Sequence, residues 1–333
     1  MTRLSIIIPV YGVERYIIRC LDSVFRINLP LSDYEVICVD DCSKDSSVSI
    51  VEEYMNRYPN LLLIRHEKNK RQGGARNTGI SRAKGEYIIF ADADDVIPEY
   101  DVSGILDYMD DNNLELMLGS AEIHKQSGAV LRWGNSPLEE SGIMAGPEVF
   151  VKEYIHRVAF GVVWIGIYKT DLVKRTGAFM ENVQYEDADW TLRCAYNAKR
   201  LQYKPIVIYD YMENEGSTTT VGSIDKLKER VKQGLRVWEW AQSITEHHDD
   251  VIMSAEDFCT WNLQCLSSLR NYRRSERVSF YQSFSDKEMS VMRAWSMGGK
   301  WMEMIKNPAA TEAKLFFLSP LYRLGRMIKR MIK

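Results

Sequence analysis

Apolar residues in the first hundred positions of the chain follow two alternating patterns. Short β-branched runs are typical of strands buried on both faces of a parallel sheet. Between these runs, apolar residues recur at helical spacing. The strand-like runs are 4–10, 35–39, 61–64 and 86–91, and the helix-like segments are 14–25, 46–58 and 73–83.

Strands that alternate with helices in short units predict an α/β fold, with a mostly parallel sheet and helices on both faces. Right-handed crossovers place the carboxyl ends of such strands at one edge of the sheet. Ligands of open α/β sheets bind at that edge. The residues that directly follow each strand are therefore the first candidates for a functional site.

The rest of the chain predicts further elements of both kinds and then a helical region. Everything from residue 225 onward is predicted to be helical. We predict one domain at 1–220, a helical region at 221–333 and a hinge at 215–225. The expected strands are 114–119, 164–168 and 206–209, and the expected helices include 148–156, 187–198, 236–244 and 258–269.

Composition narrows the class of protein. The chain has 333 residues, is 45% hydrophobic and 27% charged, and carries a net charge of −3, which does not indicate a nucleic-acid binder. It contains no signal-peptide pattern and no apolar stretch of about 18 residues, so we expect a cytoplasmic protein. No CxxC pair or zinc-type spacing occurs, which predicts free thiols. The six cysteines are at positions 20, 38, 42, 194, 259 and 265.

Acidic residues gather where the predicted sheet would contact a ligand. Asp40 and Asp41 follow the second strand, and the run Asp92-Ala93-Asp94-Asp95 follows the fourth. Neighbouring carboxylates repel one another, and a divalent cation with oxygen ligands removes that conflict. Such a cation also stabilises a departing diphosphate. A third cluster, Glu186, Asp187 and Asp189, lies at a predicted helix start.

Each acidic cluster also has a purely structural interpretation. Aspartates after strands are common in turns and helix caps, and acidic residues at a helix start complement its dipole. The sequence disfavours an EF-hand because Ile97 occupies the position where glycine is expected. The functional alternative for the third cluster is a general base that deprotonates a hydroxyl. The glycine pair Gly73-Gly74 before Arg76 is likewise either a loop feature or a place where phosphate approaches the backbone.

The order of these pieces resembles the inverting glycosyltransferases of family 2, which have the GT-A fold. The resemblance covers residues 4–98 and a shorter later stretch. It implies that the chain uses a nucleotide-sugar donor, with UDP as the expected nucleotide. The matching segments are SIIIPVYGVERYIIRCLDSV, YEVICVDDCSKDSS, GGARNTGISRAKGEYIIFADADD and QYEDADWTLR.

The resemblance assigns roles position by position. Asp187 would be the catalytic base with Glu186 beside it. Asp94 would be the main ligand of a Mn²⁺ or Mg²⁺ ion, and Asp92 would contact the metal or the ribose. The implied nucleotide-binding residues are Pro9, Val10, Tyr11, Glu14, Asp40, Asp41, Arg76, Asp92 and Ala93.

The chain departs from the family pattern in a few places. Gly12 and Cys42 stand where the family often has Asn and Gly. The QxxRW segment of processive synthases is absent, which favours transfer of a single sugar to a glycan or lipid-linked acceptor in surface polysaccharide synthesis. Two other classes remain to be compared. One is a catalytically silent nucleotide-binding module of the same fold, and the other is a dinucleotide-dependent oxidoreductase, which the missing GxGxxG disfavours.

Two further features concern the acceptor side. Aromatic residues near the third cluster either face a sugar or belong to the core. The tail at 321–333 forms a basic amphipathic pattern, which predicts either contact with an anionic membrane surface on the inner face of the cell membrane or a terminal helix docked on the protein. The aromatic residues are Trp164, Tyr185, Trp190, Tyr209 and Tyr211.

Overall fold

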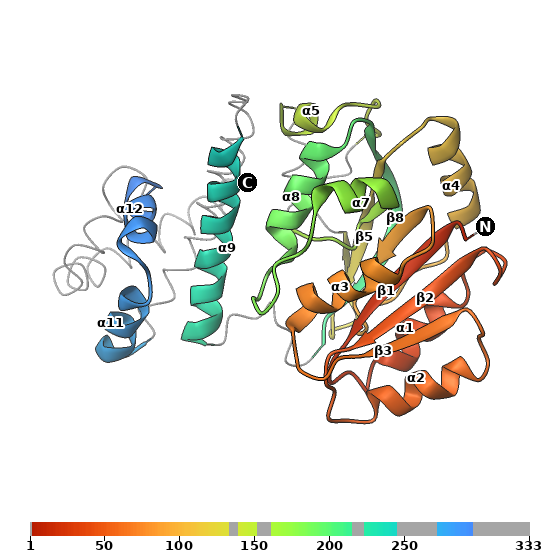
Figure 1. Cartoon of the computed structure of the whole chain (residues 1–333), viewed down its shortest axis with the longest axis horizontal. Helices are drawn as coiled ribbons and strands as arrows, with labels where there is room; N and C mark the ends of the chain where they lie inside the picture. The colour runs from red at the N-terminus through yellow and green to blue at the C-terminus, as the bar shows by residue number, and fades with distance from the viewer. Residues whose placement is uncertain (1, 133–138, 152–160, 215–222, 245–271, 296–333) are drawn as a thin grey trace. The chain divides into compact units, whose positions relative to one another are not determined.

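The computed structural model of the chain describes residues 2–132, 139–151, 161–214, 223–244 and 272–295 (Figure 1). The chain divides into two compact units. The first consists of Met1–Val221 and Glu239–Ser254, and the second of Gly222–Trp238 and Ala255–Lys333. The predicted hinge and the expected helix at 258–269 lie largely or wholly outside the described residues, as does the tail at 321–333.

Four parallel strands form one half of the sheet in the first unit, in the order β3-β2-β1-β4. Val10 of β1 is aligned with Asp40 of β2, and Asp40 with Arg65 of β3. The carboxyl ends of these strands therefore meet at one edge. The elements of this half are β1 (Leu4–Val10), α1 (Ile17–Val24), β2 (Tyr34–Asp40), α2 (Ser47–Met55), β3 (Leu61–Arg65), α3 (Arg71–Arg82) and β4 (Tyr87–Phe90).

Helices cover both faces of this half. Every residue of β1 is buried, as expected for a strand with apolar residues on both faces. On one face α3 contacts β1 and β2, and the absence of a side chain at Gly79 lets the helix approach Ile7, because a Cβ there would lie 2.4 Å from that side chain. Figure 1 shows α1 on the opposite side of the sheet from α3.

The other half of the sheet mixes strand directions. β7 is antiparallel to both β4 and β5, whereas β8 is parallel to β5 and β6 is antiparallel to it. The α/β fold with a mostly parallel sheet is thus confirmed. The elements of this half are α4 (Val102–Asp111), β5 (Leu116–His124), β6 (Val130–Arg132), α5 (Gly146–Val151), β7 (Gly166–Lys169), α7 (Thr170–Thr176), α8 (Asp187–Asn197) and β8 (Leu201–Met212).

The boundaries predicted from the sequence are least accurate in this second half. β8 is three times as long as the four-residue strand expected at 206–209. The helices α4 and α7 and the strand β6 were not predicted. The helix expected at 148–156 corresponds to α5, which ends at Val151 within the described residues.

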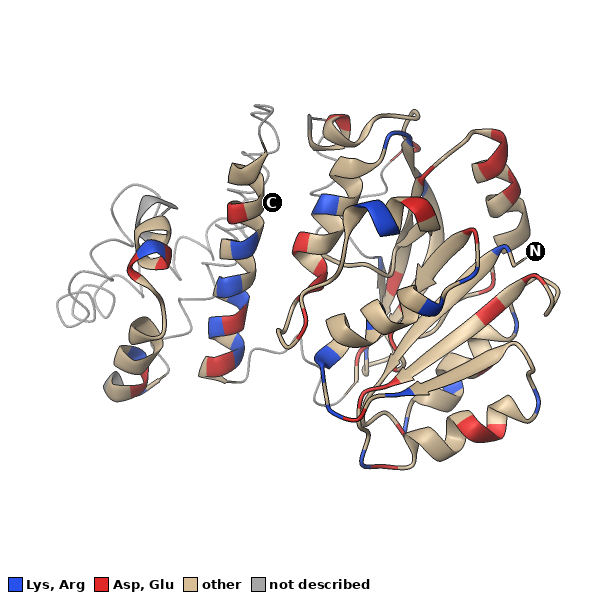
Figure 2. Cartoon of the chain, viewed as in Figure 1, with Lys and Arg blue, Asp and Glu red and all other residues tan. Residues whose placement is uncertain are grey.

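The described part of the second unit is helical, in agreement with the prediction for residues after 225. It contains α9 (Ile224–Ser243) up to Trp238, α11 (Arg274–Gln282) and α12 (Asp286–Trp295). Figure 2 shows acidic and basic residues mixed along α9, which does not resemble a nucleic-acid-binding helix. None of the helices in the described ranges has the length and apolar composition that a bilayer span needs.

Candidate active site

The ends of β1 and β2 form the first part of the site. Pro9 and Val10 are buried at the end of β1, and the next residue, Tyr11, has 57% of its surface exposed. Gly12 follows with a φ of +66°, which is the left-handed region that glycine tolerates best. The chain turns away from the sheet here and leaves the Tyr11 ring at the surface, beside the carboxyl ends of the strands.

Asp41 is the most heavily bonded residue of this part. The backbone amide of Lys70 donates to its Oδ1 at 2.8 Å, and His66 Nδ1 lies 2.7 Å from the same oxygen. The opposite nitrogen of His66 lies 2.8 Å from Thr78 Oγ1 in α3. Asp40 is also buried and accepts a bond from the backbone of Ser43. Both aspartates are therefore fixed at the sheet edge.

Glu14 lies on the outer side of this region. Its side chain is exposed, and its Oε2 accepts a hydrogen bond from the backbone amide of Ser46 at 2.9 Å. The backbone amide of Glu14 in turn donates to Asp45 Oδ2 at 3.0 Å. This reciprocal pairing joins the loop after β1 to the loop after β2, so that the two predicted nucleotide-binding segments are held together.

The Asp92–Asp95 run follows β4 at the same edge, and β8 holds it from the other side. The Tyr209 hydroxyl donates to Asp95 Oδ2 at 2.8 Å and accepts from the backbone amide of Asp92 at 3.0 Å. Asn214 Nδ2 donates to Asp94 Oδ2 at 3.2 Å. Ala93 is buried. The run is thus a defined turn in which Asp92 and Asp94 remain partly exposed.

Arg76 joins the acidic run to the third cluster. Its guanidinium donates to Asp92 Oδ1 at 2.9 Å through Nη2 and to Glu186 Oε1 through Nη1. Burial lowers the pKa of Arg76, but the neighbouring carboxylates outweigh that effect and raise the pKa above its ordinary value. Two acidic clusters that are more than ninety residues apart in the chain therefore meet around one buried cation.

Gly73 makes this meeting possible. A Cβ at this position would lie 2.2 Å from the carbonyl oxygen of Met180 and 3.0 Å from the Glu186 side chain. Without a side chain, the first turn of α3 lies directly against the segment that leads into α8. Gly73 thus serves close packing between two backbones, and that packing brings Arg76 within reach of Glu186.

Asp187 is the first residue of α8 and is partly buried beside this group. Burial raises its pKa to about 8, the Glu186 carboxylate adds to the rise, and Arg76 opposes it. Burial also raises the pKa of Glu186, although Arg76 lowers it in turn. A carboxylate with a raised pKa is a stronger proton acceptor than a free aspartate, which suits Asp187 to general-base chemistry.

The acidic run has electrostatic properties that fit a divalent cation. Burial and the neighbouring Asp92 raise the pKa of Asp94. Burial raises the pKa of Asp95 well above its usual value, and the negative charges of Asp94 and Asp92 add to the rise. A cation would relieve this repulsion. Within the described part of the chain the three aspartates do not bring three ligand atoms within 4.8 Å of one another, so Asp92 and Asp94 would hold a cation together with oxygen atoms of a ligand.

Several residues that touch the site were not predicted from the sequence. Arg19 of α1 donates to the backbone carbonyl of Asp94. His66, Tyr209 and Asn214 make the contacts with aspartates described above. These residues come from three separate segments, namely α1, the end of β3, and β8 with the residues that follow it, and no spacing in the sequence links any of them to the acidic run.

The aromatic residues of this region divide between core and surface. Trp164, Trp190 and Tyr209 are buried, so the core interpretation is correct for these three. Trp164 stacks on Tyr209 with ring centroids 4.5 Å apart. Tyr185 and Tyr211 are partly exposed, and Tyr185 has a φ of +57°.

About half of the chain matches the sequence pattern of a known protein family. The sequence pattern of Glycosyl transferase family 2 matches residues 5–168. This range contains all but the first residue of β1, the acidic run after β4, and all but the last residue of β7. It ends before the third acidic cluster.

Two relatives illustrate the range of similarity. The uncharacterized glycosyltransferase EpsJ of Bacillus subtilis is 32% identical over 221 residues, which cover 65% of this chain and 63% of EpsJ. The poly(ribitol-phosphate) beta-N-acetylglucosaminyltransferase TarS of Staphylococcus aureus is 29% identical over 214 residues, or 63% of this chain and 35% of TarS. The chain thus spans less than two thirds of the length of either relative.

Solved structures share the fold. Residues 1–349 of S. aureus TarS in complex with UDP-GlcNAc superpose with a TM-score of 0.63 at 22% identity, covering 86% of this chain and 78% of that one. A mannosyltransferase from Pyrobaculum calidifontis, in complex with GDP-Man and Mn²⁺, gives a TM-score of 0.55 at 18% identity and covers 94% of this chain and 85% of its own.

Proposed function

We propose that this chain, which belongs to the family 2 glycosyltransferases of the GT-A fold, transfers one sugar from a nucleotide-sugar donor. The acceptor would be a hydroxyl of a glycan or of a lipid-linked molecule in surface polysaccharide synthesis. The observation that carries the proposal is the bridge that Arg76 makes between Asp92 and Glu186. This bridge brings the edge proposed to bind the diphosphate next to Glu186, the neighbour of the candidate base Asp187.

The donor is proposed to be a UDP-sugar. The nucleoside would lie at the ends of β1 and β2, between Tyr11 and Asp41, with Pro9, Val10, Glu14 and Asp40 around it. Its ribose and diphosphate would extend toward Asp92, Ala93 and Arg76. Support for UDP comes from TarS, whose structure contains UDP-GlcNAc.

Asp94, assisted by Asp92, is proposed to hold Mn²⁺ or Mg²⁺. Such an ion supplies Lewis-acid stabilisation of the negative charge that develops on a leaving diphosphate. Two observations support the assignment. In this chain, burial raises the pKa of Asp94 beside a second aspartate. In the similar fold of the Pyrobaculum mannosyltransferase, the structure contains Mn²⁺. Asn214 and Arg19 would keep the Asp94 side chain and backbone in place.

Asp187 is proposed to act as the catalytic base. Its carboxylate takes the proton of the acceptor hydroxyl, and the oxygen forms a bond to the anomeric carbon from the face opposite the nucleotide. The bond between that carbon and the diphosphate oxygen breaks, the nucleoside diphosphate leaves with the electron pair, and the anomeric configuration inverts. Glu186 would assist by fixing Arg76 beside this reaction.

Donor hydrolysis tests the proposal directly. Release of nucleoside diphosphate is measured for UDP-, GDP- and dTDP-sugars with Mn²⁺ present and again after full chelation. We expect UDP-sugars to be favoured and activity to disappear on chelation. Asp94→Asn should lower kcat/KM by about 100-fold, whereas Asp171→Asn, at an exposed aspartate in the first turn of α7, should leave it unchanged within about twofold.

Two outcomes would overturn parts of the proposal. Activity that survives full chelation would exclude the metal role of Asp94. Tight UDP binding without hydrolysis or transfer of any nucleotide sugar would instead identify the chain as a catalytically silent nucleotide-binding module.

We also propose that the enzyme works in the cytoplasm and that residues 321–333 bring it to the inner face of the cell membrane. The support is in the sequence, since five basic residues and no acidic ones accompany an apolar helical stripe in this tail. A lipid-linked acceptor would be reached most readily from such a position.

A further inference from the structure

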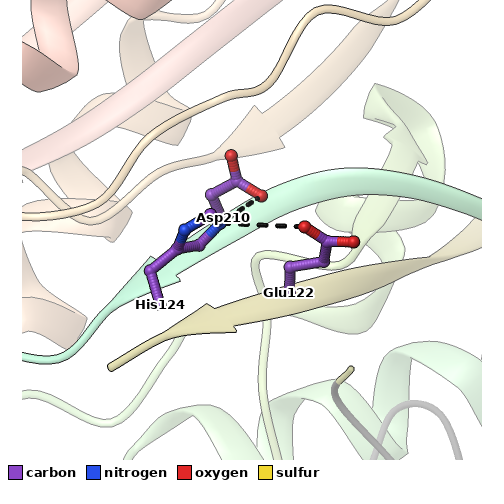
Figure 3. A group of neighbouring side chains, drawn as sticks. All are labelled: Glu122, His124 and Asp210. Carbon is purple, nitrogen blue, oxygen red and sulfur yellow. Dashed lines mark ion pairs between the residues drawn. The ribbon is translucent and has the colours of Figure 1, made fainter. Parts of the chain in front are cut away.

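A second group of potential metal ligands lies on β5 and β8. Glu122 and His124 are the final residues of β5 on one face, and Asp210 is aligned with Glu122 on the neighbouring parallel strand. One ligand atom from each of the three side chains lies within 4.8 Å of the others. Figure 3 shows the imidazole of His124 pointing to both carboxylates.

This group is separate from the acidic run after β4. Side chains alternate between the two faces of a strand, and the neighbour of Asp210, Tyr209, points to the face on which its hydroxyl meets Asp95. Asp210 therefore points to the opposite face. Glu122 and His124 lie two residues apart on β5 and share that face with Asp210.

The group is short of positive charge. His124 Nε2 lies 3.2 Å from Asp210 Oδ1 and 3.8 Å from Glu122 Oε2, and this buried nitrogen makes no hydrogen bond of acceptable geometry with a described residue. Arg132 lies opposite Glu122 on β6 but is exposed. Among the described residues, neither carboxylate forms an ion pair with a lysine or an arginine.

Electrostatics favours a divalent ion at this place. Burial raises the pKa of Asp210, and the nearby Glu122 carboxylate adds to the rise, although His124 opposes it. A neutral imidazole leaves two carboxylates facing each other, and a protonated one cancels a single charge. A divalent cation cancels both and accepts the Nε2 lone pair as a ligand.

We propose that Glu122, His124 and Asp210 bind a divalent transition-metal cation of the Zn²⁺ type. One imidazole nitrogen with two carboxylate oxygens is a donor set that suits zinc and similar ions better than magnesium, which prefers oxygen alone. This site does not depend on the glycosyltransferase proposal.

The bound ion would stabilise the end of β8. Met212 and Asn214, which follow Asp210, bond to Asp95 and Asp94 respectively. A metal that joins the ends of β5 and β8 would therefore hold the backbone that fixes the acidic run. The expected effect is structural, because the three ligands lie on the face away from Asp92 and Asp94.

Zinc binding is best measured on the full chain in a background that lacks two other candidate sites. Asp94→Asn removes the proposed catalytic metal ligand, and His247→Ala with His248→Ala removes the two histidines of the EHHDD segment. In this background we expect one equivalent of Zn²⁺, measured by competition with a chromogenic chelator. The same ion should raise Tm, and Mg²⁺ at equal concentration should not.

Adding His124→Gln to this background should weaken zinc binding by at least about tenfold and abolish the rise in Tm. Glu122→Gln is the second variant, in case the first lowers the yield of folded protein, and it should weaken binding in the same way. Equal zinc affinity in the background and in either variant would overturn the proposal. So would a background that binds no Zn²⁺, since His124 would then form only an ion pair with the two carboxylates.

Discussion

Arg76 determines how the carboxylates of the site behave as individual residues. It is 1% exposed and lies between Asp92 and Glu186. Among the described residues Arg76 pairs directly with Asp92 and Glu186, and the neighbouring Asp187 forms no ion pair with a lysine, arginine or histidine. Burial therefore raises the pKa of both carboxyl groups, and the ion pair with Arg76 offsets part of that rise at Glu186.

Asp187→Asn should remove the cost of burying a charged carboxylate and therefore raise the stability of the folded protein. The pKa of Asp187 is raised from 3.8 to about 8, so between these values the folded protein keeps a proton that the unfolded chain releases. The protonated Asp187 side chain therefore makes its full contribution to the free energy of unfolding below pH 4, and this contribution is lost as the pH rises toward 8. Asparagine does not ionise, so we expect the variant to have a Tm a few degrees higher at pH 8, with the difference vanishing near pH 4.

The same variant should retain donor binding and lose transfer, because only the proton acceptor is removed. Glu186→Gln is the matched control at the adjacent position. It leaves the buried Arg76 with one carboxylate fewer and should lower stability by about 3 kcal/mol. Near-normal turnover by Asp187→Asn, or a lower Tm at pH 8, would show that Asp187 is not the strained base described here.

At the scale of elements, β8 is the strand that organises the acidic run. Tyr209 is fully buried and its hydroxyl bonds both to Asp95 and to the backbone of Asp92. Val96 and Asp210 also exchange two backbone hydrogen bonds. The turn that presents Asp92 and Asp94 is thus supported by a strand more than a hundred residues later in the chain.

Tyr209→Phe should distinguish the hydrogen bonds of the Tyr209 hydroxyl from the packing of its ring, because the variant keeps the ring and loses only the hydroxyl. Loss of the hydroxyl removes the hydrogen bonds to the Asp92 amide and to Asp95 Oδ2, which costs about 1–3 kcal/mol, and it loosens the turn that holds Asp94. We expect lower stability together with a higher Mn²⁺ concentration for half-maximal donor hydrolysis. Tyr168→Phe removes a buried hydroxyl that bonds to the Val163 carbonyl and should lower stability alone. Equal Mn²⁺ dependence in the two variants would exclude a role for β8 in the metal site.

The accuracy of the sequence predictions also differs between elements, for physical reasons. The four strands of the parallel half are continuous apolar runs, and their positions were predicted to within one or two residues. β6 consists of three exposed residues, Val130–Arg132, which offer no buried face to detect. β8 contains Pro205, which suggests a break, but the register of β8 against β5 shifts at this point, and a bulge tolerates proline.

The residues of the site also divide into those with a local sequence pattern and those that depend on contacts between distant segments. Positions after strands or at a helix start singled out the three acidic clusters, and the resemblance to the family then selected Asp41, Asp94 and Asp187 within them. Their partners, among them Arg19, Tyr209 and Asn214, depend on contacts between segments that are far apart in the sequence. Such contacts follow from the packing of the sheet and have no local signature. The Glu122, His124 and Asp210 group was missed for the same reason, because strand pairing alone brings it together.

At the scale of the whole molecule, the unit that carries the proposed donor-binding residues is followed by a C-terminal region of different charge. The first unit carries every residue proposed to act on the donor. The last fifteen residues of the chain, 319–333, contain five basic and no acidic side chains. Since the chain as a whole carries a net charge of −3, this positive charge is concentrated at one end and would attract an anionic lipid surface.

Deletion of residues 319–333 should release the protein from anionic vesicles without affecting donor hydrolysis. Each basic residue near such a surface contributes about 1 kcal/mol to binding, so replacement of the five by glutamine in the full chain should have nearly the same effect as the deletion. Co-sedimentation with vesicles of anionic and of zwitterionic lipid measures both variants, and binding of the unaltered chain should weaken as salt is added. If the glutamine variant binds as well as the unaltered chain, charge does not hold the protein at the membrane. If the deletion instead lowers the thermal stability of the soluble enzyme while vesicle binding is unchanged, the tail is a helix docked on the protein.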